Sequence, residues 1–299
     1  MKHEVMGFEN LHRHTMNSIL DGVAQVYEYA EYSQEVDQKY LCITDHGVMG
    51  AIPQQIAASE KYGLSPIFGI EAYINPMQIK AKNRAESADF RKNLSPEEQE
   101  KFDKSCHLLM LAYNDDGYAN LVQMSSWAWI HGFYRKPRIN YDLLQRHKEG
   151  IIFTSTCGNS EIANALFKHG EEAAEEMLKQ YMAWFGDKFY LELMMLDWEK
   201  QKPYDAFLVK MHAKYGVQLI LTCDCHVCRK EQKQLQMLSL MMQTDRTLKE
   251  LKALINSNEG KDLFELQDPN LWMKSERELD EKWESDYRDI IPYELYKQS

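Results

Sequence analysis

The chain lacks the segments that export or membrane insertion would require. Its first residues, Met1-Lys2-His3-Glu4, contain no apolar core of a signal peptide. No uncharged apolar run of about 18 residues occurs, so we expect no membrane-spanning helix. Six cysteines among 299 residues are too sparse for a disulfide scaffold. We therefore expect a cytoplasmic protein with free or metal-bound thiols.

Basic charge is also scarce, and repeats and low-complexity segments are missing. Lysine and arginine number 35 against 46 acidic residues, which gives a net charge of −11. This balance argues against a protein that grips duplex DNA through a broad cationic face. It does not exclude a nucleic-acid enzyme whose metal ions supply local positive charge.

Short apolar or β-branched runs, bounded by polar residues or glycine, alternate with segments of helical periodicity. This alternation implies parallel βα units, and seven strands favour a closed or nearly closed barrel over an open sheet. The expected fold is therefore α/β. The predicted strands are residues 10–14, 40–44, 66–74, 107–113, 150–155, 189–193 and 217–222, and the predicted helices are 23–34, 51–62, 118–130, 160–168, 173–185, 204–215 and 231–242.

Two regions break this rhythm. Residues 78–104 are highly charged and contain Ser95-Pro96-Glu97-Glu98, a favourable helix start, which predicts a helical insertion between strands. From residue 247 we expect a helix at 248–256, an extended piece near 263–273, and a helix from Ser275, whose spacing to Glu278 fits a capping box. The chain end is expected to fray after Pro292. We expect a barrel domain of residues 1–246 and an extension of residues 247–299 packed on it.

Potential metal ligands gather at the predicted strand ends, where functional residues of a parallel βα barrel lie. Residues i and i+2 of a strand share a face, so a strand over residues 8–14 would present two imidazoles together. Taken alone, the two histidines could also be ordinary residues at the end of a strand. Nine groups from six segments, however, indicate a multinuclear metal site. They are His12, His14, Asp21, His46, Glu71, His107, Cys157, Asp224 and His226.

Several of these positions allow a second interpretation. Glu71 lies inside an apolar strand, where a carboxylate is costly to bury unless it is paired or metal-bound. His107 opens its strand, so either the strand starts earlier or it runs in another direction. The run Cys223-x-Cys225-x-x-Cys228 could hold structural zinc if Cys42 completed the set. We favour packing roles for these cysteines, with Cys225 facing away from the two flanking ligands.

With these residues assembled, the chain resembles the polymerase and histidinol phosphatase (PHP) family. The similarity is closest to the N-terminal PHP domain of bacterial DNA polymerase III alpha subunits and runs from about Phe8 to about Glu281. No paired-aspartate polymerase motif is found, so the chain resembles a stand-alone PHP protein or an excised domain. The matching motifs are Leu-His-Arg-His-Thr, Leu-Asp-Gly, Ile-Thr-Asp-His-Gly, Pro-Ile-Phe-Gly-Ile-Glu-Ala-Tyr, His-Leu-Leu-Met-Leu-Ala, Gly-Phe-Tyr-Arg-Lys-Pro-Arg-Ile and Asp-Cys-His.

The resemblance implies a distorted seven-stranded βα barrel that holds three divalent metal ions. By that mapping, His12, His14, Glu71 and Asp224 hold the first ion. Glu71 bridges to a second ion, held with His107 and Cys157, while Asp21, His46 and His226 hold the third. The ligand types suit Zn²⁺, Mn²⁺ or Fe²⁺. A cluster of this kind would supply a metal-bound hydroxide as nucleophile for phosphoester hydrolysis.

Residues around these ligands also carry predictions. Cys157 is either a ligand thiolate or a small buried residue, and Asp45 either orients His46 or caps the following helix. Arg135, Lys136 and Arg138 are candidates for contact with the substrate phosphate backbone, or part of a solvated loop. Arg13 is a further candidate. Because it lies between two ligands, a regular strand would point it away from the metals.

The resemblance favours a 3′–5′ exonuclease on single-stranded DNA that proofreads for a polymerase on a separate chain, in a bacterial cell or a phage-infected host. The acidic composition weighs against this hypothesis, whereas the match to replicative members supports it. A second hypothesis is a phosphomonoesterase or pyrophosphatase acting on a small substrate. A third is a non-catalytic docking module of a replisome, and the full set of nine ligands argues against it.

Overall fold

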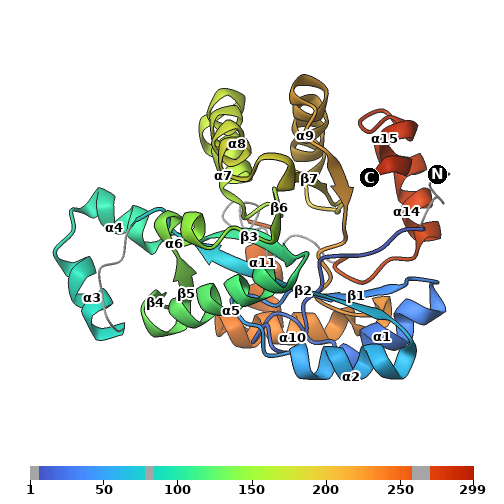
Figure 1. Ribbon diagram of the computed structural model, residues 1–299, viewed down its shortest axis with the longest axis horizontal. Helices are drawn as coiled ribbons and strands as arrows, with labels where there is room; N and C mark the ends of the chain where they lie inside the picture. The colour runs from blue at the N-terminus through green and yellow to red at the C-terminus, as the bar shows by residue number, and fades with distance from the viewer. Residues whose placement is uncertain (1–6, 78–83, 258–269) are drawn as a thin grey trace. The chain divides into compact units, whose positions relative to one another are not determined.

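The computed structural model describes residues 7–77, 84–257 and 270–299. It divides into two compact units. Unit 1 is Met1–Ile43, Gly50–Ile67 and Leu191–Ser299, and unit 2 is Thr44–Met49 and Phe68–Tyr190. The chain passes from one unit to the other on either side of residues 44–49, and again within strands β2 (Ser65–Ile74) and β7 (Phe189–Leu193). Helices and strands alternate in both units, which confirms the predicted α/β class (Figure 1).

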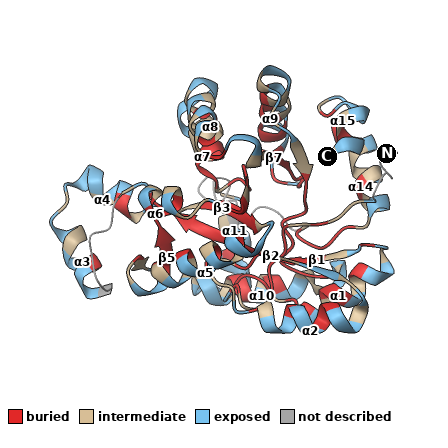
Figure 2. Ribbon diagram, in the orientation of Figure 1, coloured by how far each residue is buried: buried red, intermediate tan, exposed pale blue. Residues whose placement is uncertain are grey.

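Unit 2 contains a mixed sheet in which β2 pairs with β3 (Cys106–Ala112) and with β5 (Lys136–Ile139). Strand β3 pairs in turn with β6 (Ile151–Thr154), and β6 pairs with the first residues of β7. The short strand β4 (Phe133–Tyr134) forms a hairpin with β5. Strands β3 and β5 are almost entirely buried along their length (Figure 2).

The prediction of uniformly parallel strands is wrong for β3. It runs antiparallel to both β2 and β6, whereas β2–β5 and β6–β7 are parallel. The β2–β3 register pairs Tyr73 with His107 and Glu71 with Leu109. Because the strands are antiparallel, the start of β3 meets the end of β2. The different direction, one of the two alternatives raised for His107, therefore explains why this residue opens its strand.

The side chain of the preceding residue caps four of the described helices of unit 2, those that begin at Pro96, Asp115, Tyr141 and Glu161. Ser95 accepts from the Glu98 amide at the start of α4 (Pro96–Asp103), and this capping box confirms the predicted helix start. Together with α3 (Arg84–Lys92) it confirms a helical insertion, although residues 78–83 lie outside the described part. The remaining helices are α5 (Asp115–Ile130), α6 (Tyr141–Arg146), α7 (Glu161–His169) and α8 (Glu171–Phe185), of which α7 and α8 lie side by side (Figure 1).

Unit 1 contains β1 (Tyr40–Ile43), which pairs with β2, and β8 (Leu219–Leu221), which is parallel to the last residues of β7. The predicted strand at residues 10–14 is wrong, because only Arg13 forms an isolated bridge, to Cys225. The Asn10 side chain explains this: its Oδ1 accepts from the amides of His12 (3.4 Å) and Cys223 (3.0 Å). A side chain thus takes the place of strand hydrogen bonds. Helices of this unit are α1 (Val26–Glu35), α2 (Ile52–Tyr62), α9 (Gln201–Tyr215) and α10 (Lys233–Thr244).

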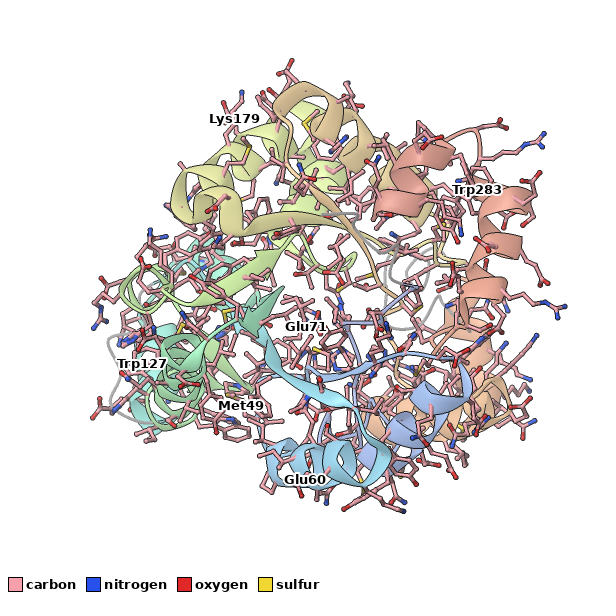
Figure 3. All side chains as sticks on the ribbon, turned by 45° about the vertical axis from the view of Figure 1, so that its right-hand side comes forward. Met49, Glu60, Glu71, Trp127, Lys179 and Trp283 are labelled. Atoms are coloured by element: carbon pink, nitrogen blue, oxygen red, sulfur yellow. The ribbon has the colours of Figure 1, made fainter. Side chains whose placement is uncertain are left out.

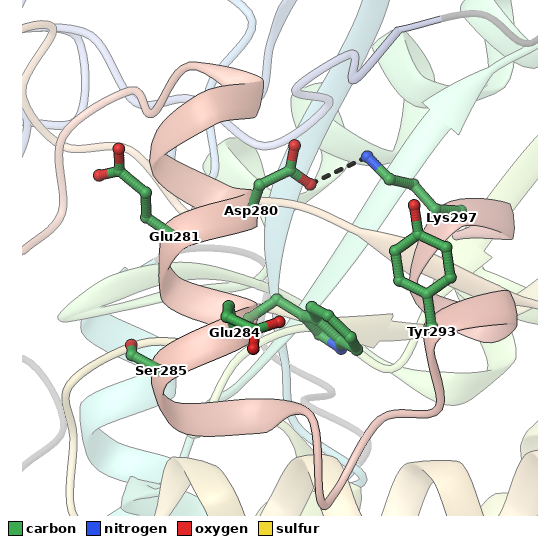
Figure 4. A pocket seen from close by; sticks show the side chains of 7 residues that line it. Asp280, Glu281, Glu284, Ser285, Tyr293 and Lys297 are labelled. Carbon is green, nitrogen blue, oxygen red and sulfur yellow. Dashed lines mark hydrogen bonds and ion pairs between the residues drawn. The ribbon is translucent and has the colours of Figure 1, made fainter.

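The C-terminal part of unit 1 is helical and well packed. Helix α11 (Leu248–Ile255) and the Ser275–Glu278 capping box of α14 (Glu276–Lys282) confirm two predictions, whereas residues 258–269 of the expected extended piece lie outside the described part. Fraying after Pro292 is wrong, because α15 (Tyr293–Gln298) buries Tyr296 and the Ser299 carbonyl accepts from the Leu221 amide at 3.1 Å. Figure 4 shows the pocket between α14 and α15, where Lys297 pairs with Asp280 at 2.9 Å.

None of the helices in the described ranges is long and apolar enough to cross a membrane. Residues 247–299 share unit 1 with the N-terminal residues. This division into units does not separate the chain at residue 246, and the domain boundary expected between residues 246 and 247 stays a prediction.

Candidate metal centre

In unit 1, two ligand-bearing segments run side by side. The amide of His14 donates to the Cys225 carbonyl at 2.7 Å, and the Cys225 amide donates to the His12 carbonyl at 3.0 Å. The hydroxyl of Tyr29, on α1, reaches the carbonyls of both His14 (3.0 Å) and Cys225 (3.2 Å). Alternation about Arg13 and Cys225 then gives the imidazoles and carboxylate of the two segments a common side, as the i, i+2 spacing predicts.

The side chains of these segments converge on the Asp224 carboxylate. Its Oδ1 lies 3.3 Å from His12 Nε2, 3.2 Å from His14 Nε2 and 3.7 Å from His226 Nδ1. His226 Nε2 lies 3.3 Å from Asp21 Oδ2, and its ring stacks on His14 with centroids 4.4 Å apart. All five groups are buried. Imidazole nitrogens and carboxylate oxygens gathered in this way are ligands of divalent transition metals.

Asp224 adopts a backbone conformation that few residues tolerate. Its φ is 46°, in the left-handed region, where aspartate is among the better accepted non-glycine residues. Such conformations cluster at functional sites because the surrounding structure has to hold them. Here the conformation points the carboxylate into the histidine cluster while Cys225 faces Asn10, whose Nδ2 lies 2.9 Å from the sulfur.

Sequence reasoning missed Glu192, which orients one of the histidines. This glutamate on β7 is fully buried and lies 2.8 Å from His12 Nδ1, and Thr222 donates to the same Oε1 at 2.6 Å. A carboxylate at Nδ1 keeps the proton on that nitrogen and leaves Nε2 as the ligand atom. The signal in the sequence was a glutamate inside the apolar strand Phe-Tyr-Leu-Glu-Leu, the same pattern that identified Glu71.

We expect Glu192→Gln to weaken the affinity of the chain for Mn²⁺ about 10- to 100-fold, because the amide no longer selects the His12 tautomer. Titration calorimetry on metal-stripped protein measures this. The matched control is Glu161→Gln, another buried glutamate, which accepts from Tyr141 (2.6 Å) and Tyr181 (2.5 Å). Burial raises the pKa of Glu161, so the amide is a close substitute and the affinity should not change. Equal affinities for wild type and Glu192→Gln would contradict this role.

Unit 2 contains a second cluster, built around Glu71. Glu71 Oε2 lies 2.8 Å from His46 Nδ1, and Oε1 lies 2.9 Å from His107 Nδ1. Backbone bonds hold this arrangement, because Gly47 donates to the Glu71 carbonyl at 2.9 Å and Glu71 donates to the Thr44 carbonyl at 3.2 Å. Figure 3 shows Glu71 on β2 amid other side chains, in contrast to Lys179 at the periphery.

Cys157 completes the cluster of unit 2. Its sulfur lies 3.5 Å from both Glu71 Oε1 and His107 Nδ1, and the residue is 1% exposed. The residue before it, Thr156, has a φ of 55° and accepts from the Leu109 amide at 2.8 Å, which directs the loop after β6 toward β3. Sequence reasoning missed Tyr73. Its ring stacks on His46 with ring centroids 5.5 Å apart and makes an edge contact with His107 with centroids 5.2 Å apart.

The four basic residues considered for substrate contact have different surroundings. Arg13 is fully buried and its guanidinium donates to Gln38 and to the Tyr40 carbonyl, an arrangement that favours a structural role. Arg138 is also buried, lies over the Phe102 ring at 4.5 Å, and burial lowers its pKa to about 10. The solvated loop, one of the two alternatives raised for this stretch, is wrong for residues 136–138, which belong to strand β5.

The other two basic residues are more accessible. Arg135 is the exposed turn residue of the β4–β5 hairpin, with a φ of 61°. Lys136 lies 4.3 Å above the Tyr73 ring, the same ring that lies against His46 and His107. Asp45 is buried, and it does not cap the following helix, because α2 begins at Ile52 and its N-cap residue is Ala51.

The cysteines near Asp224 do not form a zinc site in the described residues. Cys223, Cys225 and Cys228 are buried and free of disulfides, and the groups of ligand-type side chains that come together there do not include them. Burial raises the pKa of the Cys228 thiol to about 12, and that of Cys42 to about 12. The packing interpretation of these residues is therefore the better one.

Comparison with known proteins identifies the family of this chain. A family model described as PHP domain matches residues 10–195. The chain belongs to the PHP domain family. It is 32% identical over 243 residues to the DNA polymerase III subunit alpha of Thermus aquaticus, which covers 81% of this chain and 19% of that protein. It is 30% identical over 278 residues to the same subunit of Aquifex aeolicus, covering 93% of this chain and 23% of the relative.

This PHP chain thus spans about a fifth of the length of these curated relatives. Both relatives are bacterial, and the expected phage-infected host gains no support from them. A solved structure from Bifidobacterium adolescentis, provisionally named a metal-dependent phosphoesterase, shows a distant likeness, with a TM-score of 0.41 and 14% identity over 74% of this chain and 88% of that chain. Family membership confirms the predicted PHP-type α/β fold class.

Proposed function

We propose that this PHP chain is a metal-dependent phosphodiester hydrolase that removes nucleotides from the 3′ end of single-stranded DNA. One observation carries the proposal: each unit gathers buried imidazoles around one carboxylate, Asp224 in unit 1 and Glu71 in unit 2. Buried charges of this kind are paired or coordinate metals. The similarity to polymerase III alpha subunits supports DNA as the substrate class, and a polymerase on a separate chain as partner.

We propose that the nine residues of the PHP motifs hold three divalent ions, Mn²⁺, Zn²⁺ or Fe²⁺, as the family resemblance implies. His12, His14 and Asp224 would hold the first ion together with Glu71. Glu71, His107 and Cys157 would hold the second. Asp21, His46 and His226 would hold the third. Distances within unit 1 support part of this assignment, because Asp224 Oδ1 lies 3.3 Å from His12 Nε2 and 3.2 Å from His14 Nε2, and Asp21 Oδ2 lies 3.3 Å from His226 Nε2. In unit 2, Glu71 Oε1 lies 2.9 Å from His107 Nδ1 and 3.5 Å from the Cys157 sulfur.

Residues around the proposed ligands have separate roles in positioning the ligands and the substrate. The ions, when bound, would polarise the phosphoryl oxygens and lower the pKa of water. Glu192 holds His12 in the tautomer whose Nε2 binds, and Tyr29 holds the two segments of unit 1 together. Lys136 is the basic residue best placed for the phosphate backbone, because Tyr73 connects it to His46 and His107. Asp45 would support its neighbour His46.

The experiment that tests this function offers 5′-labelled single-stranded DNA to protein loaded with Mn²⁺, Zn²⁺ or Fe²⁺. We expect a ladder that shortens stepwise from the 3′ end and disappears on chelation. The substitution His14→Ala should remove the ladder. The control variant is His169→Ala, a histidine at the end of α7 that belongs to neither cluster, and its ladder should be unchanged.

A second candidate is hydrolysis of small phosphoesters, favoured by the net charge of −11, which disfavours long polyanions. The same preparations are therefore offered p-nitrophenyl phosphate and pyrophosphate. Turnover of these compounds with DNA left intact would replace the exonuclease by a phosphomonoesterase or pyrophosphatase. Native protein without bound ions and without activity would overturn both proposals in favour of a docking module.

A further inference from the structure

The loop of residues 15–22 in unit 1, between the proposed ligands His14 and Asp21, exposes large apolar side chains. Met16 is 60% exposed, Ile19 is 76% exposed and Leu20 is 40% exposed. Exposed single apolar residues are ordinary on a protein surface, but three in one short loop form a patch beside the proposed site. The remainder of the loop is polar or small, so these three residues are its only large apolar surface.

Hydrogen bonds fix this loop to the ligands at both ends. The Ser18 carbonyl accepts from the amides of Asp21 and Gly22, both at 3.0 Å, and the Ser18 amide donates to the Thr15 carbonyl at 2.9 Å. The Ser18 hydroxyl lies 3.1 Å from His14 Nδ1. Residues 18–21 therefore form a β-turn with Ile19 and Leu20 at its corners. The turn is joined to His14 through Ser18 and ends at Asp21.

Leu20 occupies its corner against the local preference of the backbone. Its φ is 64°, and a turn that needs positive φ at its third residue normally has glycine or asparagine there. The loop does place glycine where packing requires it, because a Cβ on Gly22 would lie 2.3 Å from the Thr15 carbonyl oxygen. A bulky side chain kept in a strained, exposed position is a feature of functional sites more than of stable scaffolds.

We infer that Met16, Ile19 and Leu20 form the surface on which the base of the terminal nucleotide rests while its phosphodiester is held at the metal ligands. This inference rests on the proposed function and adds a subsite to it. The turn is tied to His14 and Asp21, so whatever touches its corners has to be attached close to the bound phosphate. In a nucleotide that group is the base, whose apolar face gains from contact with aliphatic side chains. Aliphatic contacts lack hydrogen-bonding groups, so all four bases should be accepted.

The test compares two oligonucleotides that differ only in the 3′-terminal residue, which is either normal or abasic. Wild-type protein should cleave the normal end with kcat/KM about tenfold higher, because the base covers the apolar corners. Ile19→Ser and Leu20→Gly should lower kcat/KM for the normal end about fivefold or more and leave the abasic end unchanged. Leu238→Ser, on α10 and 52% exposed, is the matched control and should change neither rate.

Stability measurements exclude misfolding as the cause. Leu20→Gly should leave the thermal unfolding midpoint of metal-free protein close to that of wild type, because relief of the positive φ offsets the greater chain entropy of glycine. A variant that unfolds at the wild-type temperature but has lost its preference for the base has kept its fold and lost a contact. Equal wild-type rates on normal and abasic ends would overturn the inference, as would equal losses on both ends in the two variants.

If DNA is not cleaved at all, the nuclease proposal fails, and binding still tests the subsite. The probes are dAMP and deoxyribose 5-phosphate, titrated into Mn²⁺-loaded protein. Tighter binding of dAMP by about tenfold, lost in Ile19→Ser, would support the base-binding surface independently of catalysis. Equal affinities of the two compounds would refute it.

Discussion

Asp224→Asn is expected to remove metal binding by the unit 1 cluster and to lower phosphoesterase activity more than about 100-fold. Substituting a residue that only hydrogen-bonds a metal ligand already lowers metal affinity or activity about 10- to 100-fold. Asp224 contacts the other ligands directly, so its effect should be larger. Its Oδ1 lies within 3.3 Å of His12 Nε2 and His14 Nε2, so the amide would present either a neutral oxygen or an N–H group to the ion. Metal content per chain and kcat with a labelled oligonucleotide measure the effect.

The substitution also has a signature in stability. Asparagine retains the shape of Asp224 and the left-handed φ of 46°, so the metal-free variant should unfold at the wild-type temperature or above it. Added Mn²⁺ should stabilise wild type more than the variant, because an ion that binds the folded state stabilises it and the variant has lost the ion at Asp224. The control is Asp245→Asn, an exposed aspartate with a φ of 50° at the end of α10. Full metal content in Asp224→Asn would exclude Asp224 as a ligand.

The second large effect concerns Asp205, whose carboxylate supports the end of β7. It is fully buried, accepts from the Met195 amide at 3.3 Å and from Gln201 Nε2 at 2.9 Å, and burial raises its pKa to about 7 from the usual 3.8. Tyr287 of the C-terminal segment reaches the same turn, since its hydroxyl donates to the Leu196 carbonyl at 3.2 Å. Glu192 lies on the strand that leads into this turn, so Asp205 helps to hold the strand that positions Glu192.

The raised pKa predicts the direction of a pH effect on stability. Below about pH 3.8 the carboxyl is protonated in both states and contributes nothing. Between about pH 4 and 7 the unfolded chain loses this proton while the folded chain keeps it, so the folded state becomes less stable as pH rises. At about 1.4 kcal/mol per pKa unit, the loss approaches about 4 kcal/mol near pH 7 and then stays constant.

Urea unfolding of wild type and Asp205→Asn across this pH range tests the effect. The difference in unfolding free energy between the two proteins should change by several kcal/mol from pH 4 to pH 7, in favour of the variant at high pH. An exposed aspartate, replaced in Asp289→Asn, should give a difference that does not vary with pH. A pH-independent difference for Asp205→Asn would mean that this carboxyl titrates normally in the folded protein.

The unit 1 histidines separate what local patterns can predict from what they cannot. The i, i+2 spacing of His12 and His14 correctly placed both imidazoles on one side, although the expected strand is only a bridge at Arg13. The error arose because the Asn10 side chain takes over backbone hydrogen bonds, and its partner Cys223 is 213 residues away. A pairing over that separation leaves no periodic signal in either segment. The charged insertion and the capping boxes at Ser95 and Ser275 were predictable because they depend on neighbours in sequence.

The sequence by itself determined the α/β class, the PHP motifs and the ligand types, because residue chemistry and short spacings are written in the chain. Only the tertiary structure decided the reversed direction of β3, which brings His107 to Glu71, and the burial of Arg13 and Arg138. It alone revealed Glu192 behind His12, Tyr73 between two histidines, and the strained Leu20. These features depend on the directions in which side chains point after packing, and hydrophobic periodicity does not specify those directions.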